Sequence, residues 1–285
     1  MKRSFKAILF ALCALLLCGF SFTTLSAAKL SSNVRNFAPG VTFPGHLQGI
    51  AADESGIYWS CYDRIIKTKW DGTLVATVDT PTHAGDCCVK DGKLYVSVTY
   101  YKQADILKAK GLRAAVYIYD CATLRFEKYI LLKDIPFPDG ITCYKGNFYL
   151  ADNSVRKAHR LNAFYVYDSN FKFLRHEIIE IGVKTLFGAQ TLCVWNDKII
   201  AAFYPAEKYN GSCLIDPDSF TATGLFPLKA SVGLAMVPKS IAGKDNVFCI
   251  GRLAGKQGAY YLQASFHTVE NGIAKPFPVT SLKVK

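Results

Sequence analysis

The chain has 285 residues, of which 51% are hydrophobic and 20% are charged, and its 34 Lys and Arg against 22 Asp and Glu give a formal net charge of +12. Beyond the N-terminal segment no apolar run is long enough to cross a membrane, which excludes a protein with several membrane-spanning helices. The length instead allows one domain with a sizeable core.

The first 28 residues have the layout of a secretory signal peptide. Basic residues come first, an apolar stretch follows over residues 7–20, and Ser26-Ala27-Ala28 ends the segment. The apolar stretch is too short for a comfortable transmembrane span. We expect cleavage after residue 28 and a soluble mature protein, secreted or periplasmic, that has no membrane span. An uncleaved anchor is the alternative.

The mature chain stays basic. The signal segment holds three basic and no acidic residues, so the remainder carries +9 rather than +12. Outside the cytoplasm, a basic surface favours anionic glycans, cell-surface polymers or acidic small molecules and speaks against nucleic acid as a partner. The alternative is that the charge only keeps an exported protein soluble.

One short pattern recurs five times along the mature chain. In each copy a central residue is followed first by an apolar residue, then by a small one, and later by a second apolar run. The copies are 37 to 54 residues apart, a spacing typical of arrays and propellers. The central residues are Gly49, Asp86, Gly140, Thr191 and Gly233.

Each copy is followed by further strand-like runs, and turn residues such as Asp71-Gly72 close most of them. Four short antiparallel strands per unit are the pattern of a propeller blade. The third runs lie at 64–67, 116–120, 164–168, 213–216 and 260–262.

The small residues support this interpretation, because innermost strands crowd around one axis where only small side chains fit. They are Ala51, Cys88, Thr142, Cys193 and Ala235. We therefore predict an all-β fold: a single β-propeller over residues 29–285 with five four-stranded blades. The last blade needs an N-terminal strand from residues 30–43 to close the ring.

Eight cysteines remain in the mature chain, and an even number in an exported protein permits disulfides. Most lie within predicted first or second strands, where Cys acts as a small buried hydrophobe. Adjacent Cys87 and Cys88 are poorly placed for a disulfide, because neighbouring strand residues point to opposite faces. No Cys-x-x-Cys pair or Cys/His metal spacing occurs, and the sequence leaves the disulfide state open.

Polar residues gather at the entries to the predicted first strands. In an antiparallel blade the start of the first strand lies beside the end of the second, so these entries share one face of the ring with the loops that leave the second strands. That face is our candidate ligand-binding site. Its predicted floor consists of His46, Gln48, His83, Asp86, Asp139 and Gln190.

The loops that leave the second strands are long, at about 99–115, 152–163 and 204–211, and long loops on a rigid scaffold commonly carry binding residues. Arg side chains suit carboxylate, sulfate or phosphate groups, and Tyr offers a flat face to a sugar ring. Solvated loop residues with no ligand are the alternative. From these loops and the last unit we predict six more ligand-binding residues: Asp152, Asn153, Arg156, Arg160, Tyr209 and Arg252.

The floor residues allow more than one interpretation. Gln48, Asp139 and Gln190 share one aligned position, and such groups can also bridge blades through hydrogen bonds or buried water. His46 and His83, with an aspartate nearby, are residue types that bind a divalent cation or act as a general base. We assign no catalytic residue and no metal ligand. His176 and His267 fall in outer strands and are expected on the surface.

Two stretches that contain these residues resemble known families. Pro138-Asp139-Gly140-Ile141, followed by Tyr149-Leu150-Ala151-Asp152-Asn153, resembles the blade pattern of the gluconolactonase and senescence-marker lactonases. Those six-bladed enzymes bind an axial divalent cation through Glu, Asn and Asp, whereas Gln48 stands here where the Glu is expected.

Leu47-Gln48-Gly49-Ile50 resembles the Thr-Gln-Gly-Leu opening of the five-bladed glutaminyl cyclotransferases. In that family a glutamate precedes the glycine of the second blade, where this chain has Ala84-Gly85-Asp86. The family's later Asn-Glu-Leu-Glu stretch is also missing. Both resemblances cover most of the mature chain and imply a fold rather than an activity.

No Gly-x-Ser-x-Gly, His-Glu-x-x-His or phosphate-binding Gly-rich motif occurs. We expect an exported monomer that binds a small anionic or carbohydrate-derived ligand, a small molecule or a glycan, at its channel mouth. One alternative is a metal-assisted, lactonase-like hydrolase on the same face, which would use a divalent cation. Another is a protein-interaction platform. The sequence leaves open whether the protein is an enzyme.

Overall fold

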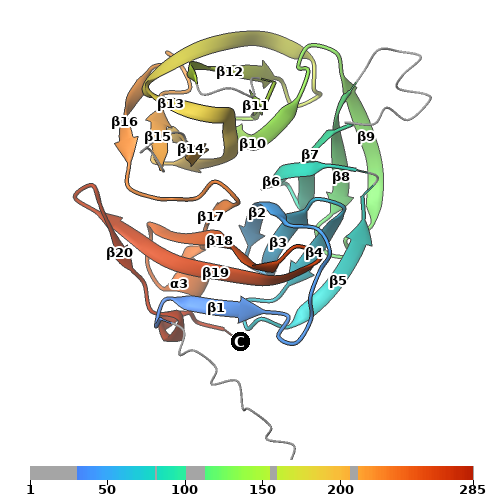
Figure 1. The fold of residues 1–285 in the computed structure, drawn as a ribbon, viewed down its shortest axis with the longest axis vertical. Helices are drawn as coiled ribbons and strands as arrows, with labels where there is room; N and C mark the ends of the chain where they lie inside the picture. The colour runs from blue at the N-terminus through green and yellow to red at the C-terminus, as the bar shows by residue number, and fades with distance from the viewer. Residues whose placement is uncertain (1–30, 81, 101–112, 155–158, 206–210, 285) are drawn as a thin grey trace, which may run out of the picture. The chain divides into compact units, whose positions relative to one another are not determined.

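In a computed structural model of the chain, residues 31–80, 82–100, 113–154, 159–205 and 211–284 are described. The predicted signal peptide, residues 1–28, lies outside them. The described residues form antiparallel sheets set around a central axis (Figure 1). Their helices are short, α3 (Lys239–Ala242) and a 3-10 turn at Val279–Ser281. Among these residues no helix is long and apolar enough to cross a membrane.

Two four-stranded sheets run in chain order from the axis outward (Figure 1). The innermost strands β2 and β6 are almost entirely buried, whereas the outermost strands β5 and β9 are largely exposed. The first sheet contains β2 (Leu47–Asp53), β3 (Gly56–Cys61), β4 (Arg64–Thr68) and β5 (Leu74–Asp79). The second contains β6 (Ala84–Lys90), β7 (Lys93–Thr99), β8 (Ala114–Asp120) and β9 (Phe126–Leu132).

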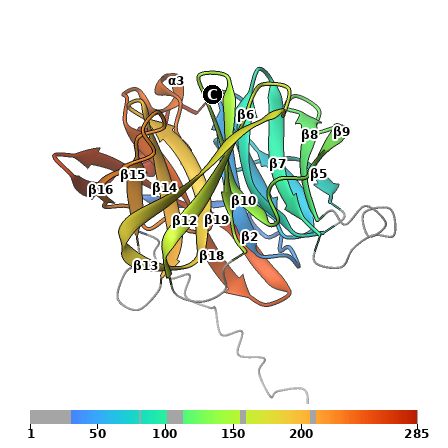
Figure 2. The ribbon, with the colours of Figure 1, turned by 90° about the horizontal axis from the view of Figure 1, so that it is seen from above.

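The third sheet has seven strands because β13 belongs to two units. Residues 173–185 of β13 pair with β12 on the outside of one unit, and residues 185–195 pair with β14 at the inside of the next. Figure 2 shows β13 as one long ribbon. The strands are β10 (Pro138–Tyr144), β11 (Asn147–Asp152), β12 (His159–Tyr167), β13 (Phe173–Trp195), β14 (Lys198–Pro205), β15 (Ser212–Ile215) and β16 (Ala222–Phe226).

The last sheet joins the two ends of the described chain. β1 (Val34–Phe37) pairs with β19 at residues 262–265, and β20 (Ile273–Pro276) pairs with the other end of β19. β1 lies within the residues 30–43 that the sequence requires for closure. The inner strands of this sheet are β17 (Leu234–Met236), β18 (Val247–Lys256) and β19 (Ala259–Glu270).

The apolar core is divided into layers between neighbouring four-strand units. In the layer between the last and the first unit, Phe37 packs on Trp59 with ring centroids 5.0 Å apart, and both side chains are buried. Near the axis, the five predicted small residues line one narrow cavity of about 190 Å³. These features confirm the predicted β-propeller class. The number of five blades stays a prediction, because the hydrogen bonding gives four sheets.

The cysteines act as apolar residues of this core. All eight cysteines of the described residues are free thiols, and only Cys143 is not fully buried. Cys87 and Cys88 lie side by side in β6 without a disulfide.

Candidate functional site

A β-bulge lies at the entry to each innermost strand that carries a predicted polar floor residue. The antiparallel register shifts between Leu47 and Gly49, Ala84 and Cys87, Pro138 and Ile141, and Ala189 and Thr191. A bulge leaves one residue outside the ladder and redirects its side chain, and bulges are common beside functional sites. The residues so placed include Gln48, Asp86, Asp139 and Gln190.

Gln48 and His83 form one hydrogen-bonded pair across the first two units. The Gln48 amide Nε2 donates to Nε2 of His83 over 2.8 Å, and both side chains are buried. The His83 ring lies edge-on to Tyr62, with centroids 5.1 Å apart. The ring of the second predicted histidine, His46, lies 5.7 Å from that of Tyr62 and 6.1 Å from that of Tyr260, measured between centroids.

Burial lowers the pKa of His46, so its imidazole is neutral near pH 7. Tyr62 contacts both His46 and His83 and therefore joins two histidines from neighbouring units. The sequence analysis did not single out this tyrosine. Its exposed fraction of 37% distinguishes it from the buried aromatic residues of the core.

Asp139 and Asn153 form a second pair. Asn153 Nδ2 donates to Asp139 Oδ2 over 2.7 Å, and the carboxyl group is almost completely buried. Burial raises the pKa of Asp139 to about 8, against the opposing effect of the Asn153 hydrogen bond. Asp139 is therefore mainly protonated and neutral at pH 7. Oδ1 of Asn153 is buried and has no hydrogen-bond partner among the described residues.

Glycine allows the second unit to approach this pair. A Cβ atom at Gly85 would lie only 2.5 Å from Oδ1 of Asp139. Gly85 is two residues from His83, so the two hydrogen-bonded pairs lie in neighbouring units. The structure thus brings four predicted residues to one end of adjacent strands: Gln48, His83, Asp139 and Asn153.

Asp86 is completely buried and stabilises the arrangement of the innermost strands. Its Oδ2 accepts the backbone N–H groups of Ile141 over 3.2 Å and of Leu192 over 2.8 Å, and its exposed fraction is 0%. Burial raises the pKa of Asp86 well above the usual range, although these backbone bonds oppose the shift. One carboxyl group from the second unit therefore holds the innermost strands of the next two.

The remaining predicted residues that the structure describes make local contacts of their own. Gln190 is buried and donates weakly to the Gly188 carbonyl over 3.5 Å. Asp152 accepts hydrogen bonds from Ser154 within a local turn. The exposed Arg160 guanidinium lies 3.6 Å from Glu180. Arg156 and Tyr209 lie outside the described residues.

The lactonase resemblance implies a divalent cation, and the described residues can be tested for side chains that would hold it. Among the described residues no three His, Cys, Asp or Glu side chains come together to hold a metal ion. The Gln48 amide is hydrogen-bonded to His83, and Oδ2 of Asp86 accepts backbone N–H groups. We therefore derive no reaction step through a metal.

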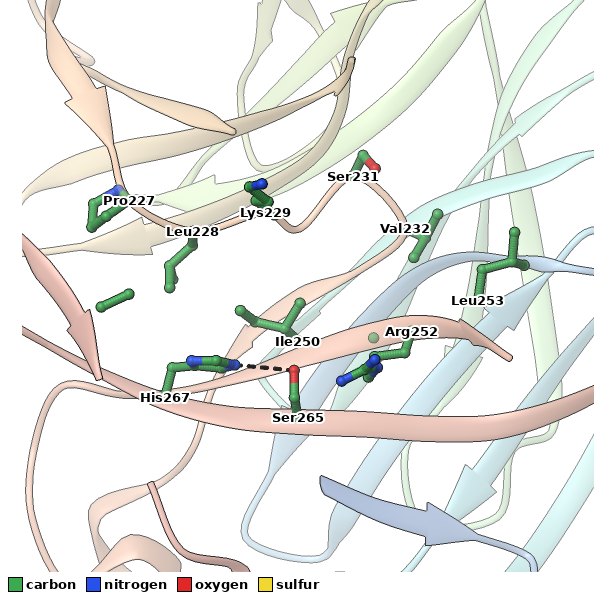
Figure 3. Close-up of a pocket in the computed structure, with 12 residues that line it drawn as sticks. Pro227, Leu228, Lys229, Ser231, Val232, Ile250, Arg252, Leu253, Ser265 and His267 are labelled. Atoms are coloured by element: carbon green, nitrogen blue, oxygen red, sulfur yellow. Dashed lines mark hydrogen bonds between the residues drawn. The ribbon is translucent and has the colours of Figure 1, made fainter. Parts of the chain in front are cut away.

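Arg252 lines a separate cavity of about 530 Å³ beside the last sheet (Figure 3). Lys229, Ser231, Ser265 and His267 line it too, and the sequence analysis did not assign any of them to a site. His267 was expected on the surface, but it is half-buried in this cavity, where its ring contacts Asn33 and Ser265. The alternation of β19 places Ser265 and His267 on one face, which is the pattern that could have revealed them.

No protein-family model matches the sequence, and neither does any curated protein. Among solved structures, the glutaminyl cyclase of Myxococcus xanthus is 12% identical and superposes with a TM-score of 0.55 over 83% of this chain and 97% of that one. Hydrazine synthase of Kuenenia stuttgartiensis is 14% identical, with a TM-score of 0.46 over 85% of this chain and 68% of that one. A protein of unknown function from Bacteroides caccae is 11% identical, with a TM-score of 0.48 over 73% and 71% of the two chains. At 12% identity the likeness to the glutaminyl cyclase shows the fold alone, and the chain is a β-propeller protein.

Proposed function

We propose that this protein is an exported β-propeller that binds a small carbohydrate-derived molecule at the mouth of its axial channel. The observation that carries the proposal is the pair of neighbouring hydrogen-bonded couples, Gln48 with His83 and Asp139 with Asn153, at bulged strand entries. Export rests on the predicted signal peptide.

The chemistry of these four groups suits hydroxyl groups. Amides and a protonated carboxyl group each offer both hydrogen-bond donors and acceptors, and the two ring nitrogens of an imidazole add further polar atoms. A sugar hydroxyl also does both, so it matches such a site better than an ion that only accepts. Asn153 is the least buried of the four side chains, and its Oδ1 has no hydrogen-bond partner among the described residues.

Aromatic rings stand beside these groups. Tyr62 and Tyr260 flank His46, and Tyr62 is partly exposed. Aromatic faces pack well against the apolar face of a sugar ring. A few polar groups together with aromatic rings are the usual composition of a small-molecule site.

The test is a screen of the mature protein on a glycan array that holds neutral and acidic sugars, followed by titration calorimetry with the sugar that binds. We expect Asn153→Ala to weaken binding about three- to tenfold, the usual effect of losing one neutral hydrogen bond. Asn170→Ala is the matched control, because Asn170 is exposed in a turn on another loop. If the wild-type protein binds no sugar, or if both variants bind equally, the proposal is wrong.

A further inference from the structure

We propose a second binding site, for a small organic anion, in the cavity between residues 227–232 and the face of β18 and β19. Its ligand has an apolar body and one oxyanionic group, such as a phosphate or carboxylate. The inference does not rest on the proposed function, because the cavity shares no lining residue with the two hydrogen-bonded pairs at the channel mouth.

The cavity has the size and position of a binding site. Its volume of about 530 Å³ falls in the range of about 300 to 1,000 Å³ that holds small molecules. Strand alternation places Arg252 of β18 and Ser265 and His267 of β19 on the same face. Figure 3 shows Lys229 and Ser231 on the segment opposite that face.

The charge in the cavity is positive and unbalanced. Lys229 and Arg252 both line it, and no acidic side chain does. Within the part of the chain that the structure describes, neither of these side chains forms an ion pair, whereas Arg64 and Lys198 do. A concave site with two cations and no carboxylate concentrates anions, and the planar Arg fork matches two oxygens of an oxyanion.

His267 adds a polar ring to the lining of the cavity. Asn33 Nδ2 lies 3.4 Å from Nε2 of His267, so the ring is held between this amide and Ser265. Ser265 Oγ lies 3.1 Å from the same Nε2. Burial, and then the charge of Arg252, lower the pKa of His267.

The opposite wall is fixed by buried hydroxyl groups. Ser212 Oγ donates to the Leu228 carbonyl over 2.7 Å, and Thr191 Oγ1 donates to the Ala230 carbonyl over 2.8 Å. Both hydroxyl side chains are completely buried. A Cβ atom at Gly251 would lie 3.1 Å from the carbonyl oxygen of Val232, so glycine lets the two walls approach. A wall held in this way loses little entropy when a ligand binds.

Part of the lining is apolar, which indicates more than a bare ion. An apolar body can occupy this part while its charged group lies against Arg252 and Lys229. Inorganic phosphate would leave the apolar part unfilled. The apolar side chains are those of Leu228, Val232, Ile250, Leu253 and Ala274.

The probes are phenyl phosphate and benzoate, with benzyl alcohol as the neutral analogue, titrated into the mature protein by calorimetry up to about 10 mM. We expect saturable binding of at least one of the two anions, and binding of benzyl alcohol at least tenfold weaker. Arg252→Gln should weaken anion binding about 10- to 100-fold, as expected for the loss of charge-assisted hydrogen bonds.

Arg125→Gln is the control variant, because Arg125 is also exposed but lies between β8 and β9, away from the cavity lining. It should bind the anion like the wild-type protein. A second variant, Ser265→Leu, fills the polar end and should abolish binding while the thermal unfolding midpoint reports that the protein remains folded. Absence of anion binding by the wild-type protein, equal binding of benzyl alcohol, or unchanged binding by Arg252→Gln would each overturn the proposal.

Discussion

Replacing Asp139 with asparagine should change how the stability of the protein depends on pH. The pKa of the buried carboxyl group is about 8, against an ordinary value of 3.8. Between these values the folded state holds a proton that the unfolded state releases, so the stability falls as pH rises through this window. Each pH unit in the window corresponds to about 1.4 kcal/mol, which sets an upper limit of roughly 6 kcal/mol at pH 8 and above.

The side-chain amide of the Asp139→Asn variant would keep an acceptor for Asn153 but would not titrate. The free energy of unfolding of the variant, relative to wild type, should therefore rise between about pH 4 and pH 8 and then level off. Asp86 titrates in both proteins, so most of its contribution cancels. Urea unfolding can be followed by tryptophan fluorescence, because Trp59 and Trp70 are buried in the native state.

The decisive quantity is how steeply the free energy of unfolding changes with pH. Any pH-independent cost of the new amide shifts the curve of the variant without changing its slope. Glu54→Gln, which removes a carboxylate from an exposed position, is the control. If the wild-type and Asp139→Asn curves run parallel to within about 0.5 kcal/mol over this range, then burial does not hold the proton on Asp139.

Three further predictions concern the scaffold. Asp86→Ala should be less stable than Asp86→Asn by about 2–4 kcal/mol in urea unfolding, because only the asparagine variant keeps an acceptor for two buried N–H groups; equal stability would refute the clamp between strands. Gly49→Ala places a Cβ atom 2.4 Å from Asp86 Oδ1 and should lower the thermal midpoint, at a cost of about 1–3 kcal/mol or more; an unchanged midpoint would contradict this close approach. Burial raises the pKa of Cys87 and Cys249, so Ellman's reagent should modify these thiols only after unfolding. Rapid modification of either thiol in the native protein, located by peptide mapping, would contradict this prediction.

The strands could be predicted because their pattern is local and repeated. Gly140 with its apolar and small neighbours needs only a few residues of sequence to be recognised, and the same few residues form the innermost strand β10. The small side chains at the axis, such as Ala51 and Thr142, follow from the same crowding in each unit. The continuous β13 was harder to foresee, since strand length depends on how two neighbouring units meet.

The contacts of the candidate site could not be predicted in the same way. The amide of Asn33 meets His267 across 234 positions of sequence, and Asp86 meets Leu192 across 106. Such contacts form only when distant units of the ring pack together, so no local sequence pattern predicts them. Three residues of the polar floor, Gln48, Asp139 and Gln190, were found because they share an aligned position. No such alignment singled out Lys229 or Ser265.

The pairing of β1 with β19 has a consequence for the order in which the protein forms. The strand made first on the ribosome is held by a sheet whose other members are made last, at residues 234–276. Contacts between such distant segments form slowly, because the intervening chain must be ordered first. Ring closure is therefore expected to be a late event. Until it occurs, the exposed edge of β19 remains available to other chains, so wrong pairing at that edge competes with closure.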